Sequence, residues 1–385
     1  MRPIRRLRAH WKRYKYAIFK FLVSIWLVPL IQLSALLFSR SRNTEGPVAL
    51  IVTSRSKQMS PSFYCLAPQL ERAGIDVIYV SENHSNTSLF AKIRQIYAFF
   101  SACKYADFVF LDDTFLPVSY ALKYKWLFRP LVVQIWHSAG LFKRVGIDVT
   151  KGRLATYLMK RNFRNFDLVV VSSEACRDAI AGFMGLGGHK VVALGTSYTD
   201  QYFDAAISTK RKVINSDRRT LVYAPTFRGD ASKVKPSPAP QVARILPQFE
   251  GEFDCFISTH PHERKVFEQF KCHFALSDAL GEIDVLITDY SSIAMDYMVA
   301  NPDGRLILFA PDLESYALDV GFYIPLEEIT ANIAYDEAGL QALLSLKLDD
   351  DYDDYRDKYL TLCDGHATVR LLDHLGIDQC KNRVP

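Results

Sequence analysis

The sequence predicts an α/β protein built from two parallel sheets that helices cover on both faces. From Pro47 onward, short β-branched runs alternate with segments of helical pattern, which is typical of parallel strands joined by helical crossovers. The runs are apolar almost throughout, as expected of strands that are buried on both faces. The chain has 385 residues, 49% of them hydrophobic, and this length favours two domains over one.

Ten strands are expected, in two groups. The first group comprises residues 48–53, 75–80, 107–112, 131–136, 167–172 and 191–195. The second comprises residues 220–225, 254–259, 284–289 and 305–310. The polar stretch that begins at Asp204 separates them. We therefore predict an N-terminal domain over 44–203, a C-terminal domain over 204–360, and a final helical segment, 361–385, that packs back on the first domain.

The N-terminal segment, residues 1–43, is expected to associate with a membrane. The formal charge is +5, but residues 1–42 hold ten Lys or Arg and no acidic residue, so the rest of the chain sums to −5. The uncharged stretch 21–38 is at the lower limit of a membrane span. A long basic lead disfavours a cleaved signal peptide. An element lying in the membrane interface is favoured over a span or a buried helix, because polar or helix-breaking residues interrupt the apolar run at Pro29, Gln32 and Ser34.

Composition excludes several other classes. A nucleic-acid-binding protein would more often carry its positive charge on the folded domain. The seven cysteines are odd in number and form no CxxC pair, which argues against a disulfide framework or a zinc site and favours a reducing, cytoplasmic compartment. No GxGxxG follows the first strand and no GxxxxGK[ST] is present. No cofactor, no metal and no nucleic-acid partner is therefore expected.

Polar motifs follow several of the predicted strands, at the edge where open parallel sheets bind ligands. In WHSAGLFKRVGID (136–148), the strand ends directly in Trp136 and His137. An imidazole can accept a proton near neutral pH, which a general base acting on a hydroxyl must do. The alternative is a structural histidine that is hydrogen-bonded to the backbone. The strand-end position favours the base.

Two further motifs follow strands of the second group. In YAPTFRGD (223–230), Thr226 supplies a hydroxyl and Arg228 a forked cation suited to phosphate, although a surface loop with an incidental arginine is equally compatible. In STHPH (258–262), His260 lies where the strand stops. A His-x-His pair without a third ligand is a weak metal site, so an imidazole that contacts phosphate is favoured.

The stretch DVLITDYSSIAMDYM (284–298) places four polar residues where a buried strand gives way to a helix, namely Thr288, Asp289, Ser291 and Ser292. Backbone N–H groups at a helix N-terminus bind anions. The alternative is that one of these residues only caps the helix, but capping needs a single polar residue, so four of them favour a phosphate site. The fifth motif, CDGHATVRLLDHL (363–375), is a glycine turn before an amphipathic helix. This turn can face a ligand or only cap the helix.

Taken in order, these motifs resemble those of the CDP-glycerol glycerophosphotransferase family, the teichoic-acid primases and polymerases. The resemblance covers roughly residues 45–375. Its most specific part is LITDYSS followed by Asp296 and by FAPDLESYALDVGFY (309–323).

The resemblance implies a GT-B-like architecture, in which two Rossmann-like domains face each other across a cleft. It implies an acceptor-side first domain and a second domain that binds the CDP-linked donor. The implied enzyme transfers glycerol phosphate, or ribitol phosphate in relatives, from CDP-glycerol or CDP-ribitol to a hydroxyl of a lipid-linked or polymeric acceptor and releases CMP. It would work as a peripheral protein on the cytoplasmic face of the membrane surface.

The resemblance also implies roles for single residues. His137 falls on the proposed base, and His260 is the second catalytic candidate. The remaining donor-binding positions implied by the family, together with those taken from the motifs themselves, are Trp136, Ser138, Ala139, Gly140, Pro225, Thr226, Arg228, Ser258, Thr259, Thr288, Asp289, Ser291, Ser292, Asp296, Asp364 and Gly365.

The chain also departs from the family pattern. The usual Trp-His-Gly-Thr-Pro is WHSAG (136–140), Pro-Arg-Asn-Asp is SYTD (197–200), and an arginine two residues before His-Pro is Ser258. Two cations expected to face a pyrophosphate are thus absent, which leaves the exact donor open. Two other functions remain open: a GT-B glycosyltransferase that uses a nucleotide sugar, and an inactive membrane-associated scaffold of the same fold.

Overall fold

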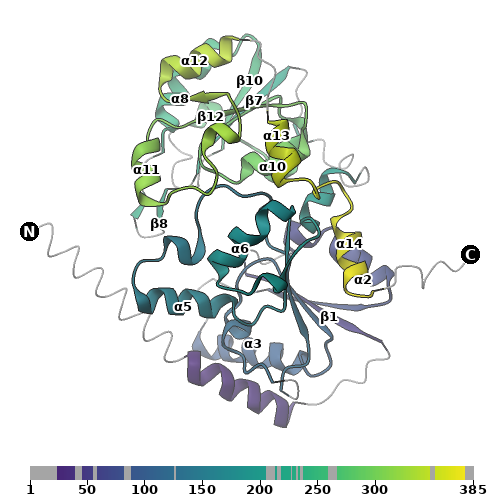
Figure 1. Cartoon of the computed structure of the whole chain (residues 1–385). Helices are drawn as coiled ribbons and strands as arrows, with labels where there is room; N and C mark the ends of the chain where they lie inside the picture. The colour runs from purple at the N-terminus through teal and green to yellow at the C-terminus, as the bar shows by residue number, and fades with distance from the viewer. Residues whose placement is uncertain are drawn as a thin grey trace, which may run out of the picture.

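The chain folds into two α/β units, drawn one above the other in Figure 1. In this computed structural model, the described residues are 24–39, 46–54, 59–81, 88–124, 127–204, 213–214, 218–226, 228–230, 233–234, 237–258, 267–346 and 352–377. The predicted site residues Thr259 and His260, and most of the basic N-terminal segment, lie outside these ranges.

The first unit is built on a six-stranded parallel sheet in the order β2-β1-β3-β4-β5-β6. Its strands are β1 (Val48–Thr53), β2 (Asp76–Ser81), β3 (Phe108–Leu111), β4 (Leu131–Gln134), β5 (Leu168–Val171) and β6 (Val191–Ala193). Successive residues of β1 belong to two different apolar cores: Leu50 and Val52 to one, Ala49 and Ile51 to the other. Both faces of the sheet are therefore covered, which explains the continuous apolar runs.

Helices pack on both faces of this sheet. They are α2 (Leu66–Arg72), α3 (Leu89–Ala102), α4 (Leu116–Tyr120), α5 (Arg153–Phe163) and α6 (Arg177–Met184). Helix α6 ends where Gly185 adopts a φ of 66°, a left-handed conformation that glycine adopts without strain.

The second unit contains a five-stranded parallel sheet in the order β10-β7-β11-β12-β13. The strands are β7 (Arg219–Ala224), β10 (Phe253–Ile257), β11 (Val285–Thr288), β12 (Arg305–Phe309) and β13 (Ile333–Ala334). The helices are α8 (Ala239–Ile245), α9 (Leu276–Ala279), α10 (Ile293–Ala300), α11 (Leu313–Asp319) and α12 (Glu337–Ser345).

All ten predicted strands are confirmed, with ends that differ by at most two residues from those expected. The sequence did not predict β13, which has two residues, or the short antiparallel pair β8 (Gly229–Asp230) and β9 (Lys233–Val234). Strands this short carry too few residues to produce a recognisable pattern.

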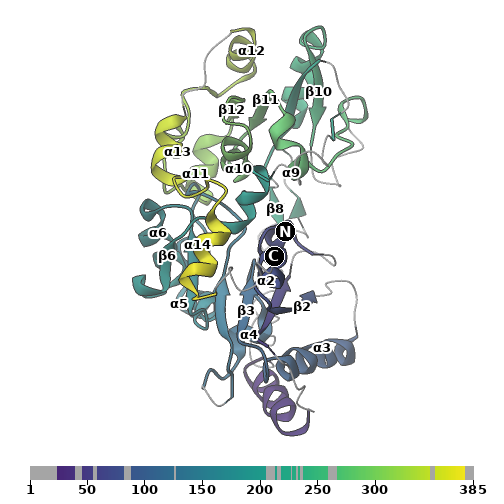
Figure 2. The same cartoon turned by 90° about the vertical axis from the view of Figure 1, so that its right-hand side faces the viewer.

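The C-terminal segment returns to the first unit, as both views show for α14 beside α2 (Figures 1 and 2). It comprises α13 (Asp353–Tyr359) and α14 (Ala367–His374). Leu371 and Leu372 join the apolar core that contains Ala49 and Ile51. The carboxylate of Asp200 accepts hydrogen bonds from the first two amides of α14, at 3.1 and 2.7 Å.

Residues 24–38 form a helix at the lower edge of the first unit in Figure 1. One face is buried in the domain core through Val28, Ile31 and Ala35. Gln32, one of the polar residues that interrupt the apolar run, is buried and exchanges hydrogen bonds with the backbone of Leu122, at 2.8 and 3.0 Å. Within the described ranges, no helix combines the length and apolar character that crossing a membrane requires.

The other face of this helix is apolar and exposed. Trp26 is 71% exposed and Phe38 is 77% exposed, and Leu30 and Leu37 are exposed as well. Both faces of the helix therefore carry apolar side chains, but only one of these faces is covered by the described protein.

Candidate active site

A cavity of about 420 Å³ lies between the two units and brings together the sequence motifs at 136–148 and 284–298. From the first unit it is lined by the loop that follows β4, by Val145 and by two residues of α6. From the second unit it is lined by the N-terminal end of α10 and by Tyr323. The predicted site residues on its wall are Trp136, His137, Ser138, Ala139, Gly140, Ser291, Ser292 and Asp296.

His137 follows a strained turn at the end of β4. Trp136 has a φ of 59°, which is uncommon for a residue other than glycine. Its backbone N–H donates to Oε1 of Gln134 at 3.0 Å. The Trp136 indole stacks on the His137 ring, with centroids 4.6 Å apart, and also contacts Phe183. These contacts hold the imidazole in one orientation at the cavity wall.

The backbone carbonyl of Asp112 lies 2.7 Å from Nδ1 of His137. Because a carbonyl oxygen only accepts, Nδ1 carries the proton and Nε2 is the basic nitrogen. Asp112 is itself buried, and its Oδ2 accepts a hydrogen bond from Thr53 Oγ1 at 2.9 Å. His137 can therefore be both a structural histidine and a general base. Its Nδ1 is hydrogen-bonded to the backbone, and this hydrogen bond fixes the tautomer in which Nε2 can accept a proton.

Three consecutive amides of the loop after His137 are bound by hydroxyl groups. The N–H groups of Ala139, Gly140 and Leu141 donate, in that order, to Tyr198 at 2.6 Å, Ser172 at 2.9 Å and Tyr355 at 3.0 Å. These amides are used within the protein. The loop is therefore held rigid, and its contribution to a ligand rests on its shape and on side chains such as that of Ser138.

Ser291 and Ser292 precede α10, whose first turn faces the same cavity. Ser292 is the N-cap residue, and its side chain makes no capping hydrogen bond. The Oγ of Ser291 accepts from the Ile293 N–H at 3.4 Å. Asp296 lies one turn further on and accepts a hydrogen bond from the Tyr198 hydroxyl. The cavity thus combines a helix N-terminus and two hydroxyls with one carboxylate.

Thr288, Asp289 and Arg228 are buried and are not among the residues that line the cavity. Thr288 Oγ1 donates to the Ala224 carbonyl at 2.6 Å. Asp289 Oδ1 accepts from the N–H and hydroxyl of Thr226, at 2.7 and 2.5 Å. These contacts direct the side chains into the protein, so they support the helix terminus from behind.

Arg228 was expected to present its guanidinium to phosphate. It is 8% exposed and pairs with the fully buried Asp289 at 2.7 Å and with Asp312. Its guanidinium also lies over the Tyr290 ring, 5.4 Å from the centroid. A buried carboxylate requires a compensating cation, and Arg228 supplies it. The positive charge is thereby neutralised inside the domain.

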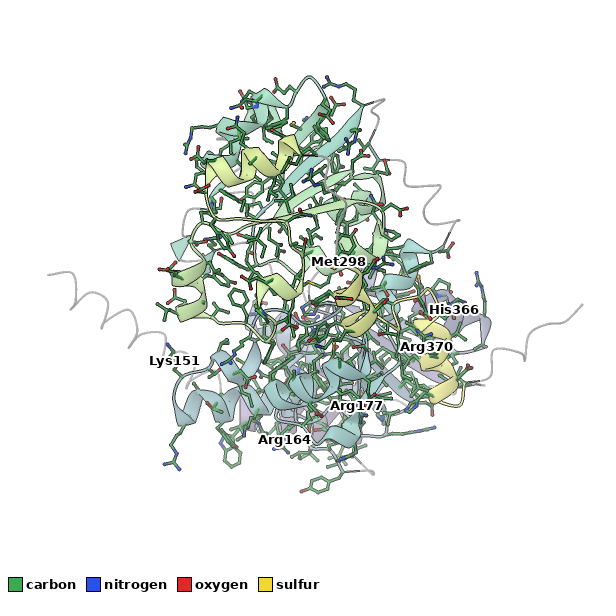
Figure 3. The ribbon with its side chains drawn as sticks, turned by 45° about the horizontal axis from the view of Figure 1, so that its top comes forward. Lys151, Arg164, Arg177, Met298, His366 and Arg370 are labelled. Atoms are coloured by element: carbon green, nitrogen blue, oxygen red, sulfur yellow. The ribbon has the colours of Figure 1, made fainter. Side chains whose placement is uncertain are left out.

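The late glycine turn lies away from the cavity wall. Asp364 accepts hydrogen bonds from Arg370 at 2.9 and 2.7 Å, and these bonds lower the pKa of the Asp364 carboxyl. Figure 3 labels Arg370 on α14. Gly365 has a φ of 84° and approaches Phe203 so closely that a Cβ would lie 2.9 Å from it. The described contacts give this turn a structural role in docking α14.

Lys143 is the residue that sequence reasoning missed. Among the described residues that line the cavity, it is the one lysine or arginine. Burial lowers the pKa of its amine, and the negative charge of Asp289 acts in the opposite direction. The segment 136–148 contains Lys143 and Arg144 side by side, and which of them faces the cavity depends on the fold. Across the described ranges, no three His, Cys, Asp or Glu side chains group as metal ligands would.

Comparison with known proteins identifies the family. A family model described as CDP-Glycerol:Poly(glycerophosphate) glycerophosphotransferase matches residues 36–376. The chain belongs to this family. It is 28% identical over 299 residues to the teichoic acid ribitol-phosphate polymerase TarK of Staphylococcus aureus (strain NCTC 8325 / PS 47), a match that covers 70% of this chain and 56% of TarK.

A second relative is closer in length. The teichoic acid ribitol-phosphate primase of Bacillus spizizenii (strain ATCC 23059 / NRRL B-14472 / W23) is 26% identical over 296 residues, which cover 69% of this chain and 73% of the primase. By contrast, the chain spans only 56% of TarK and 62% of the S. aureus polymerase TarL.

Solved structures share the fold. The wall teichoic acid polymerase TagF superposes with a TM-score of 0.67 at 17% identity, over 97% of this chain and 98% of that one. A UDP-GlcNAc 2-epimerase from Methanocaldococcus jannaschii superposes with a TM-score of 0.56 at 12% identity, over 86% of this chain and 100% of that one. The expected GT-B-like pair of parallel α/β units is confirmed.

Proposed function

We propose that this protein transfers an alditol phosphate, glycerol phosphate or ribitol phosphate, from a CDP-alditol to a hydroxyl of a lipid-linked or polymeric acceptor and releases CMP. The observation that carries the proposal is the cavity in which the basic Nε2 of His137 shares a wall with the N-terminus of α10. Family membership and relatives named as ribitol-phosphate polymerases and primases support the same reaction class.

The donor pyrophosphate would bind at Ser291 and Ser292, where each anionic charge gains about 0.3–1 kcal/mol from the helix terminus and up to about 2 when partly buried. Lys143, the one lysine or arginine among the described residues of the cavity wall, would supply a cation for this site. The Asp296 carboxylate would repel phosphate, so we assign it to hydroxyl groups of the donor.

The other predicted donor residues are divided by their contacts. Pro225 and Ser258 stand at the ends of β7 and β10, and we propose them, with Thr259, as secondary donor contacts. His260 stays the second catalytic candidate. We assign four residues to supporting the helix terminus, because they bond to other groups of the protein, namely Thr226, Arg228, Thr288 and Asp289. Asp364 and Gly365 are assigned to docking α14.

In the proposed reaction, Nε2 of His137 removes the proton from the acceptor hydroxyl as its oxygen attacks the β-phosphorus of the donor. The bond between the β-phosphorus and the bridging oxygen breaks, and CMP leaves with the electron pair. A general base contributes about 10²–10⁴ in rate, and positioning in the cavity supplies much of the remainder. The Asp112 carbonyl stabilises the imidazolium that forms, because it accepts from Nδ1–H.

We also propose that the protein is held at the cytoplasmic face of a membrane. The exposed apolar face of the helix at 24–38 supplies the buried area, and the ten basic residues within 1–42 supply attraction to anionic headgroups. This attachment would bring the protein to the membrane surface that carries a lipid-linked acceptor. The half-buried helix suits a peripheral attachment.

The reaction is tested by incubating full-length protein with CDP-glycerol or CDP-ribitol and membrane vesicles that carry the acceptor, with CMP as the readout. CMP release is expected, and His137→Gln should lower it by about 10²–10⁴-fold. His189→Gln, at an exposed histidine outside the cavity, is the matched control and should retain activity. Release from neither donor, or full activity of His137→Gln, would refute the proposal. Consumption of a UDP- or GDP-sugar instead would identify a glycosyltransferase.

A further inference from the structure

The Tyr198 hydroxyl joins the two walls of the cavity. Tyr198 lies in the 3₁₀ segment Ser197–Tyr202 of the first unit and is 6% exposed. Its hydroxyl oxygen accepts from the Ala139 N–H at 2.6 Å, two residues after His137. The same hydroxyl donates to Oδ1 of Asp296 on α10 of the second unit. A single buried atom therefore connects the loop that carries His137 to the helix at the proposed phosphate site.

The direction of this relay follows from the groups involved. A backbone N–H can only donate, so the one hydroxyl proton of Tyr198 is available for Asp296. Burial and the negative charge of Asp296 raise the pKa of Tyr198 well above its ordinary value, so the hydroxyl keeps its proton near neutral pH. The relay from Ala139 through Tyr198 to Asp296 is therefore a fixed feature of the folded protein.

The neighbouring amides are held differently. Ser172 accepts from the Gly140 N–H and donates to the Tyr359 carbonyl at 2.7 Å. Tyr355 accepts from the Leu141 N–H and donates to the Leu141 carbonyl at 2.6 Å. Of the three hydroxyls, Tyr198 is thus the one whose hydrogen bonds, as described, run to α10.

The loop and α10 also touch directly at this point. A Cβ built on Gly140 would lie 3.1 Å from Cγ of Met295, the residue before Asp296. A shift of α10 is therefore transmitted to the loop both by packing and through the Tyr198 hydrogen bonds. Any ligand that moves Asp296 would alter the support of Ala139 as well.

We propose that Tyr198 is a positioning residue that couples Asp296, on the donor side of the cavity, to the loop that orients His137. Only the expected effect of Tyr198 on the rate of CMP release rests on the proposed function. The structural consequence is that the Ala139 amide depends on Asp296 through the Tyr198 hydroxyl.

Hydrogen-exchange mass spectrometry of the peptide over residues 136–145 tests this coupling without any substrate. Tyr198→Phe keeps the buried ring but removes both hydrogen bonds, and exchange there should rise at least tenfold. Asp296→Ala leaves the Tyr198 hydroxyl in place, and it should also speed exchange, by several-fold. Tyr297→Phe is the matched control, because it removes a buried hydroxyl of α10 that donates to the carbonyls of Ile283 and Asp284. It should leave the peptide unchanged.

Kinetics then separate this coupling from the proposed function. In the CMP assay, Tyr198→Phe should lower kcat at least tenfold, whereas Tyr297→Phe should stay within about twofold of the wild type. Unchanged exchange over 136–145 in Asp296→Ala would overturn the proposal, as would equal exchange in Tyr198→Phe and Tyr297→Phe. Absence of CMP release from the wild type would overturn the proposed function and leave the exchange result to decide the coupling.

Discussion

Gly140 sits where the His137 loop, α10 and the C-terminal segment meet, and Gly140→Ala should strongly destabilise the fold. Its φ of 66° is the left-handed conformation that residues with a Cβ rarely adopt. An added Cβ would lie 2.6 Å from the Tyr355 hydroxyl, 3.1 Å from Cδ2 of Leu360 and 3.1 Å from Cγ of Met295. The first of these separations requires an atom to move.

The expected loss of unfolding free energy has a backbone part and a contact part. For the backbone part, the left-handed conformation costs about 1–2 kcal/mol for an alanine. For the contact part, overpacking costs about 1–3 kcal/mol. Displacing the Tyr355 hydroxyl weakens its two hydrogen bonds to Leu141, at about 0.5–1.5 kcal/mol each. The contact part, overpacking together with the two weakened hydrogen bonds, therefore amounts to at most about 2–6 kcal/mol.

Gly376→Ala isolates that contact part. Gly376 has a φ of 68°, close to that of Gly140, but apart from its chain neighbours no atom of the described residues lies within 4 Å of the Cβ it would gain. Urea unfolding of both variants should show Gly140→Ala losing about 2–6 kcal/mol more than Gly376→Ala. Equal losses would refute the reasoning, because they would show that backbone conformation alone makes glycine necessary at position 140.

Two further predictions concern the buried ion pair and the membrane. Arg228→Met should lower the unfolding free energy by about 3–5 kcal/mol, because it leaves the fully buried Asp289 without the cation that pairs with it. The control variant Arg129→Met, at an exposed ion pair with Asp107, should lower the unfolding free energy much less. Similar losses in the two variants would contradict the structural role of Arg228. Replacing Trp26 and Leu37 by serine should reduce sedimentation of the protein with vesicles that contain anionic lipid, whereas the same change at exposed Phe90 and Leu318 should not. Equal retention in both double variants would contradict docking through the helix at 24–38.

The fold was largely predictable because each strand buried on both faces leaves a continuous apolar run. The run at 284–289 predicted β11 to within one residue at each end. Strand β13 was not predictable, since two residues are too few to show a hydrophobic periodicity. The helix at 24–38 was predicted only in part: its apolar run was evident, but the burial of Gln32 depends on Leu122, ninety residues away.

The candidate site was predictable to a similar degree. The rule that ligands bind beyond the carboxyl ends of parallel strands brought His137, Ser291 and Ser292 to one cavity. It could not reveal that Arg228 is neutralised, because its partner Asp312 is distant in sequence and becomes a neighbour only in the folded domain. The position of Lys143 on the cavity wall likewise depends on how the two units face each other.

The position of the donor in the cavity is tested most directly by the structure of a His137→Gln variant in complex with CDP-glycerol or CDP-ribitol. We expect the β-phosphate to contact the Ser291 and Ser292 end of α10 and Nζ of Lys143. The side chain at position 137 should lie beside the face of the β-phosphorus that the acceptor attacks. A donor whose pyrophosphate lies outside this cavity, or whose β-phosphorus faces away from position 137, would contradict it.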